Sequence, residues 1–147
     1  MIIGSRPTWE EYALALASTA ATRAACTRRQ VGAAILDRFT MRVIALGYNG
    51  TPAGEVNCTD GGCPRGQLSY EECPALGDYS NCRGRHAEVN AIDHALSMIS
   101  YLGDCFIAIT REPCDGCRAA IIEYGLDHAI WYKPGVELEI EHWYPRG

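Results

Sequence analysis

Two short motifs in the second half of the chain constrain its fold more than any other feature. The first is His86-x-Glu88, and the second is Cys114-x-x-Cys117 preceded by Pro113. One imidazole and two thiolates can bind a tetrahedral zinc ion through three positions and leave the fourth to water, which is how a catalytic zinc site is built. The fold must therefore bring two distant segments of the chain to one metal ion.

Either motif alone is compatible with several kinds of site. A Cys-x-x-Cys pair is also typical of a redox dithiol or of half a structural zinc site, and a His-x-Glu triplet occurs often by chance. Found together, with a strand-like run between them, the motifs favour a catalytic zinc. A structural site would need a fourth protein ligand and would have no use for Glu88. We therefore expect His86, Cys114 and Cys117 to bind the metal and Glu88 to be the catalytic acid and base.

Both motifs are expected to lie where helices begin. Residues 86–99 have apolar side chains at helical spacing, and residues 115–124 read as a helix that ends at Gly125, a favourable C-terminal cap. Side chains three residues apart share a helix face, so Cys114 and Cys117 should point the same way. The positive end of a helix lowers the pKa of a nearby thiol, which favours metal binding.

The other periodic segments complete an α/β pattern. Strand-like runs at 104–110 and 128–132 flank the second helix. Strand, helix and strand at this spacing predict a parallel crossover, with the thiolates at the carboxyl end of a strand. The remaining predicted elements are a helix over 9–25 that begins with a Thr8/Glu11 capping box, hairpin strands at 31–37 and 42–48, and a short edge strand at 136–140.

The fold class is therefore α/β. We expect one domain over residues 1–147, in three α/β/α layers around a mixed sheet of about five strands. The net charge of −5 argues against a general grip on nucleic acid, but it leaves room for a small phosphorylated substrate. The N-terminus lacks signal-peptide features and no apolar run of about 18 residues could span a membrane, so we expect a cytoplasmic protein.

A segment rich in cysteine lies between the hairpin and the first motif. Residues 55–85 show no periodicity, and a loop of this length inside a compact domain needs something to order it. Four thiolates binding a second, closed zinc ion would do so, because structural zinc contributes folding free energy directly. Their spacing is looser than that of most zinc ligands, and buried free thiols are the alternative. The four residues are Cys58, Cys63, Cys73 and Cys82.

The residues alone leave the roles of two polar features undecided. Arg23, Arg28 and Arg29 lie near the end of the first predicted helix, where they could be solvated cations or could bind a phosphate. Asn49 lies in the turn-rich loop 47–54, either as a turn residue in a left-handed conformation or as a ligand-binding group at a strand end.

The two motifs together resemble those of the cytidine deaminase superfamily, in which a non-ligand Glu works beside a His/Cys/Cys zinc site. Within it the chain is similar to the deoxycytidylate (dCMP) deaminases. This closer resemblance rests on the arginine-and-cysteine segment before Val31-Gly32-Ala33, on the loop Gly47-Tyr48-Asn49-Gly50-Thr51-Pro52 and on the cysteine-bearing insert. It covers nearly the whole chain and implies a cytidine-deaminase-like fold.

The resemblance also implies a reaction and its partners. The reaction is zinc-dependent hydrolytic deamination of dCMP to dUMP with release of ammonia. By the same resemblance, Asn49 would contact the sugar and the backbone N–H of Ala87 the pyrimidine. Arg23 or Arg28 would bind the 5′-phosphate. Relatives are commonly hexamers, and regulation by dCTP and dTTP is a further expectation. Neither a nucleic acid nor a membrane is an expected partner.

Two alternatives keep part of this interpretation. One retains the chemistry but acts on another cytosine nucleotide or on a nucleoside. The other is a non-catalytic, zinc-stabilised nucleotide-binding module that has kept the fold without the reaction.

Overall fold

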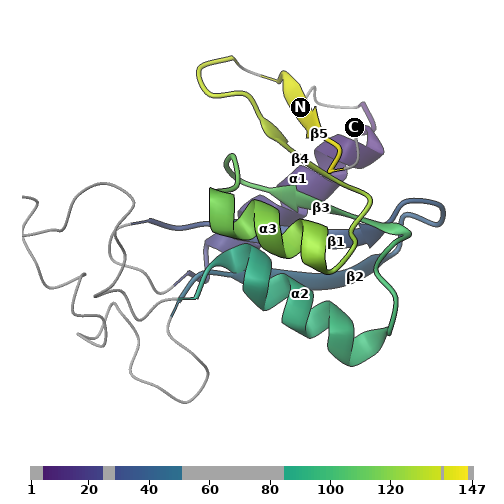
Figure 1. Ribbon diagram of the computed structural model, residues 1–147. Coiled ribbons are helices and arrows are strands. Elements are labelled where there is room, and N and C mark those ends of the chain that lie inside the picture. The colour runs from purple at the N-terminus through teal and green to yellow at the C-terminus, as the bar shows by residue number, and fades with distance from the viewer. Residues whose placement is uncertain (1–4, 25–28, 51–84, 137, 146–147) are drawn as a thin grey trace, which may run out of the picture.

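The computed structural model describes residues 5–24, 29–50, 85–136 and 138–145 (Figure 1). These residues form three helices and five strands. In chain order the elements are α1 (Trp9–Ala21), β1 (Gly32–Asp37), β2 (Val43–Tyr48), α2 (Ala87–Met98), β3 (Cys105–Ile109), α3 (Asp115–Glu123), β4 (His128–Tyr132) and β5 (Ile140–Trp143). No helix in these ranges is both long and apolar enough to cross a bilayer.

The five strands make one mixed sheet in the order β2-β1-β3-β4-β5. β1 pairs antiparallel with both β2 and β3, β3 pairs parallel with β4, and β4 pairs antiparallel with β5. The predicted parallel crossover from β3 through α3 to β4 is confirmed. Because β3 and β4 run the same way, the connection from β3 to α3 leaves the sheet at the carboxyl ends of these strands.

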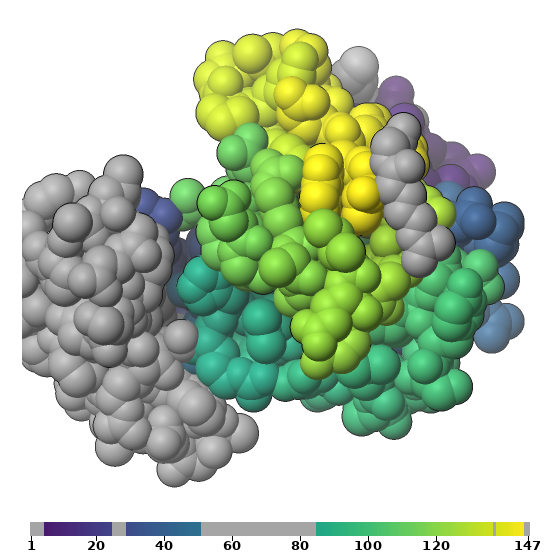
Figure 2. All heavy atoms as spheres, viewed as in Figure 1, coloured from purple at the N-terminus to yellow at the C-terminus, as the bar shows by residue number. Residues whose placement is uncertain are grey.

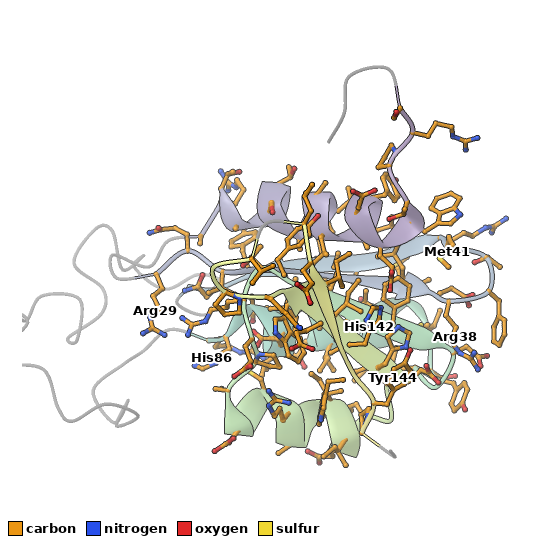
Figure 3. The ribbon with its side chains drawn as sticks, turned by 90° about the horizontal axis from the view of Figure 1, so that it is seen from above. Arg29, Arg38, Met41, His86, His142 and Tyr144 are labelled. Atoms are coloured by element: carbon orange, nitrogen blue, oxygen red, sulfur yellow. The ribbon has the colours of Figure 1, made fainter. Side chains whose placement is uncertain are left out.

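Helices cover both faces of the sheet, which confirms the predicted three layers. α1 lies on one face and α2 with α3 on the other, as the view along the sheet in Figure 3 shows. Each inner strand therefore alternates between two cores. In β1, Ala33 and Ile35 pack toward α2 and α3, whereas Ala34 and Leu36 pack toward α1. A strand buried on both faces reads as a continuous apolar run, as this one does.

Two glycines allow the helices to approach the sheet closely. A Cβ atom on Gly32 would lie 1.9 Å from the carbonyl oxygen of Ala17 in α1. A Cβ atom on Gly47 would lie 2.5 Å from both the carbonyl oxygen of Ala87 and the backbone nitrogen of Ala91 in α2. The backbone of α2 therefore rests directly on β2, and this contact sets the height of the helix above the sheet.

The first helix is shorter than predicted. Its capping box forms as expected, with Thr8 Oγ1 accepting from the Glu11 N–H at 3.1 Å. The helix ends at Ala21 rather than at residue 25. Its buried face is centred on Leu14 and on the alanines, while Trp9 stays 53% exposed. The small side chains on this buried face let α1 approach the sheet closely.

The last strand was predicted too early in the chain. Within the described residues β5 begins only at Ile140. Gly135 and Leu138 both have positive φ angles, 75° and 64°, which interrupt extended backbone. A local pattern cannot reveal a positive φ angle at a leucine, because leucine rarely adopts one.

Candidate metal centre

His86 and Cys114 each lie immediately before the first turn of a helix. His86 is the N-cap residue of α2 and Cys114 the N-cap residue of α3, both with extended backbone and neither with a side-chain capping bond. Neither side chain caps its own helix, so both are available to a metal ion. Cys117 lies one turn into α3 and is buried, while Cys114 is exposed.

The structure brings the three predicted ligands together. The Nδ1 atom of His86 lies 3.2 Å from Cys117 Sγ and 3.5 Å from Cys114 Sγ. The three ligand atoms all lie within 4.8 Å of one another, and within the described residues no fourth side chain joins them as a possible ligand. Tetrahedral zinc with bonds of about 2.0 Å to nitrogen and about 2.3 Å to sulfur separates its ligand atoms by about 3.5 Å. The geometry fits a zinc ion with one open position.

Glu88 lies beside this group inside the protein. It is 4% exposed, and among the described residues no other charged side chain is buried. Its carboxylate is in hydrogen-bonding contact with Cys117. Burial raises the pKa of the Cys117 thiol, and the charge of Glu88 and the neighbouring Cys114 raise it further. The lowered thiol pKa expected from the helix N-terminus is therefore outweighed in the metal-free site, and a divalent cation would relieve the clustered negative charge.

The approach to α2 is tied to the end of β2. Gly50 and Arg85 form an isolated antiparallel bridge, in which the Gly50 N–H donates to the Arg85 carbonyl at 3.2 Å and the Arg85 N–H donates back. The Arg85 guanidinium also pairs with Asp93, two turns along α2. His86 therefore follows a residue that is held on both its backbone and its side chain.

The Asn49 side chain is held by two hydrogen bonds to backbone groups. Its Nδ2 donates to the Arg29 carbonyl at 2.8 Å, and its Oδ1 accepts from the Val31 N–H at 2.8 Å. Its φ angle is not positive, so the left-handed turn, one of the two alternatives for this residue, does not apply. The side chain instead fixes the segment that enters β1. Asn49 directly follows β2, and its contact with the sugar stays a prediction.

The remaining predicted substrate contacts are placed only in part. Ala87 is the first residue of α2 and is fully buried. Arg23 is exposed just beyond the end of α1. Arg28 lies outside the described residues, as do Cys58, Cys63, Cys73 and Cys82.

Arg29 is a residue that motif reasoning left undecided. In Figure 3 it lies on the same side of the molecule as His86, while Arg38 and Met41 in the β1–β2 hairpin lie on the opposite side. Its backbone carbonyl accepts the hydrogen bond from Asn49. The signal in the sequence was weak, because three arginines share this segment and nothing local distinguishes them.

The N-terminal turn of α3 is supported by aromatic residues from the end of the chain, which sequence reasoning missed. The Arg118 guanidinium lies 5.4 Å from the ring centre of Trp131 and 4.9 Å from that of Trp143. It also pairs with Glu112 at 3.8 Å. In Figure 2, C-terminal residues in yellow lie against α3 in green. Since Arg118 follows Cys117 directly, this packing steadies the turn that carries both thiols.

The family match and the similar proteins all point to one family. The family described as "Cytidine and deoxycytidylate deaminase zinc-binding region" matches residues 7–133. A deoxycytidylate deaminase of Mycobacterium phage D29 is 40% identical over 134 residues, covering 88% of this chain and 98% of the relative. One from Schizosaccharomyces pombe is 38% identical over 133 residues, which cover 86% of this chain but only 38% of the longer yeast protein.

The solved structures agree in fold. A dCMP deaminase of the cyanophage S-TIM5, in complex with dCMP and dUMP, superposes with a TM-score of 0.65 at 22% identity and covers 87% of this chain and 83% of its own. A cytidine deaminase from Burkholderia pseudomallei has a TM-score of 0.57 at 20% identity, with 91% of each chain covered. The predicted cytidine-deaminase-like fold is confirmed.

Proposed function

Because the chain belongs to the cytidine and deoxycytidylate deaminase family, we propose that it catalyses the hydrolytic deamination of dCMP to dUMP with release of ammonia. The observation that carries this function is the convergence of His86, Cys114 and Cys117 beside the buried carboxylate of Glu88. Three protein ligands leave a position for water, and a carboxylate that is not a ligand has a use only if protons must move.

His86, Cys114 and Cys117 would hold the zinc ion. When bound, zinc lowers the pKa of a water molecule in its open position from about 15.7 to about 7, so that a nucleophile is available at neutral pH. The protein residues fix the position of that chemistry. Both N-cap ligands extend from rigid helices, and Cys117 is held by the packing of α3 against the sheet.

Glu88 moves the protons of the reaction. Its carboxylate accepts a proton from water and passes it to N3 of the cytosine ring, which makes C4 more electrophilic. After the water oxygen has added to C4, Glu88 takes the remaining proton from that oxygen and transfers it to the exocyclic amine. The C4–N bond then breaks, the C4 carbonyl forms and ammonia leaves. One carboxylate serves both steps because it can reach the water and the base from a single position. General acid and base catalysis of this kind contributes about 10²–10⁴-fold to a rate.

The proposed contacts to the pyrimidine and the sugar lie near the start of α2 and the end of β2. The backbone N–H of Ala87 lies in the first turn of α2, where N–H groups have no partner within the helix, and it would donate to the pyrimidine. Asn49 would contact the sugar. Arg23 and Arg28 are our candidates for the 5′-phosphate, and Arg29 joins them because Asn49 holds its backbone.

The experiment that tests the substrate is a comparison of turnover on dCMP, CMP, deoxycytidine and dCTP. The proposal predicts the highest kcat/KM for dCMP and a large loss when the 5′-phosphate is removed. Equal values with and without the phosphate would contradict a nucleotide substrate and would favour a nucleoside deaminase. Comparing dCMP with CMP reports the contribution of the 2′-hydroxyl, which no motif in this chain addresses.

Three further expectations stay predictions. A second zinc ion on the cysteines of the insert would give about two zinc ions per chain in metal analysis, and a firm value of one would remove it. A hexamer, expected from family resemblance, is testable by light scattering. Regulation by dCTP or dTTP would appear as a change in the dCMP saturation curve when either nucleotide is added.

A further inference from the structure

β2 is an outer strand of the sheet, and two of its carbonyl groups are satisfied by side chains of α2. Asn90 Nδ2 donates to the Tyr48 carbonyl at 2.8 Å, and His94 Nδ1 lies 3.3 Å from the Leu46 carbonyl. Residues four apart on a helix rise about 6 Å, and residues two apart on a strand span about 6.8 Å. The two periods match, so consecutive turns of α2 reach alternate carbonyls of β2.

Gly47 lies between these two carbonyls and brings the helix down onto the strand. No side chain fits between Gly47 and the backbone of Ala87 and Ala91. The glycine therefore sets the distance between α2 and β2, and buried residues such as Ala91 and Ile92 turn one face of the helix toward the core. The side-chain hydrogen bonds from α2 add a directional contact with the strand.

Asn90 is the donor closer to the metal centre. Its backbone N–H donates to the His86 carbonyl at 3.1 Å, so Asn90 completes the helical turn that begins at the ligand. His86 is the N-cap of α2 and Glu88 is the second residue of the helix, so both side chains extend from its first turn. Their positions at the metal therefore depend on how this turn is held against β2.

We propose that Asn90 is a positioning residue for the metal centre. Its bond to the Tyr48 carbonyl holds the first turn of α2 against β2, so that the His86 imidazole and the Glu88 carboxylate face the same ion. The inference rests on the zinc site of the proposed function, and it adds a residue that touches neither the metal nor the reacting atoms. His94 anchors the same helix one turn further from the site and has no such role.

The test compares Asn90→Leu, which keeps the shape of the side chain but removes its N–H donor, with His94→Leu as the matched control. Metal affinity is measured by chelator competition without nucleotide, and the visible spectrum of the cobalt-substituted protein reports the coordination geometry. Asn90→Leu should weaken metal binding by about tenfold or more and shift the cobalt bands, as changes in supporting residues do. His94→Leu should lower the Tm while leaving affinity and spectrum unchanged.

Two results would overturn the proposal. One is an Asn90→Leu protein with the affinity and cobalt spectrum of the wild type. The other is an equal loss in both variants, which would assign the effect to general docking of α2. If Asn90→Leu does not fold, Asn90→Gln replaces it: the longer amide should bind metal more weakly than the wild type, and unchanged binding would overturn the proposal. Failure of the proposed function would instead appear in the wild-type protein, as absence of metal binding or turnover.

Discussion

His86 and Cys114 occupy the same position in two different helices, and the Nδ1 and Sγ atoms of these residues lie 3.5 Å apart. Each is the N-cap of its helix, so the amino-terminal ends of α2 and α3 meet at the metal centre. Helix amino termini carry partial positive charge, which favours an anionic thiolate and an anionic carboxylate near them. The fold thus offers an environment in which Glu88 and two thiolates can be close together.

The first prediction concerns the acid and base. Glu88→Gln should bind zinc as the wild type does, because the amide keeps the shape of the side chain and Glu88 is not in the ligand group. Turnover should fall by at least about 10²–10⁴-fold, since the amide cannot carry protons. Zinc content and kcat are measured on the same sample. Activity within a few-fold of the wild type would contradict the role of Glu88.

The second prediction concerns the reactivity of the cysteines. Cys105 is buried, and its burial together with the charges of Asp37 and Asp104 raises its pKa to about 11. At pH 8 about one part in a thousand of this thiol would be ionised. After removal of zinc with a chelator, alkylation should modify the exposed Cys114 and spare Cys105, as peptide mapping would reveal. Bound zinc should protect Cys114, and equal labelling with and without zinc would count against its role as a ligand.

The third prediction concerns the contact between α2 and β2. Gly47→Ala should destabilise the protein by about 1–3 kcal/mol, because the new methyl group meets helix backbone that cannot move aside. It should also weaken zinc binding, since α2 carries His86. Gly125→Ala is the control: its φ of 75° strains an alanine, costing about 1–2 kcal/mol, but no atom lies within 4 Å of the new methyl group. The control should lose stability and keep the metal affinity of the wild type.

The fourth prediction concerns pH and the turn of the β1–β2 hairpin. Backbone N–H groups of Thr40 and Phe39 donate to Asp37 and hold its pKa below the ordinary value of 3.8. The stabilisation by the charged carboxylate is therefore complete above pH 3.8 and is lost as the pH falls through the lower folded-state pKa. The difference in unfolding free energy between the wild type and Asp37→Asn, measured in urea, should shrink on acidification from about pH 7 to about pH 2.5. A difference that stays constant would show that the charge contributes nothing.

The metal ligands could be predicted from sequence because their information is local. Cys114 and Cys117 are three residues apart, and His86 and Glu88 two apart, so each half of the site is specified by a few consecutive residues. Only the meeting of the halves depends on the fold. That meeting was inferred from the pairing of the two motifs, while the crossover pattern placed only the thiolates, at the carboxyl end of a strand.

The supporting contacts could not be predicted, because their partners are backbone groups or distant side chains. Asn90 binds the carbonyl of Tyr48, and Arg118 lies over Trp143. No spacing rule connects such pairs. The buried face of α1 depends on distant partners in the same way: it is decided by how closely the helix approaches the sheet, and small residues such as Ala17 permit the closest approach.

The bridge between Gly50 and Arg85 has a consequence for how this chain tolerates change. The bridge joins the two ends of the segment between Gly50 and Arg85. The entropy cost of closing such a segment rises only slowly with its length. We therefore expect insertions and deletions between these two residues to leave His86 in place, which makes this segment a suitable site for grafting a foreign peptide.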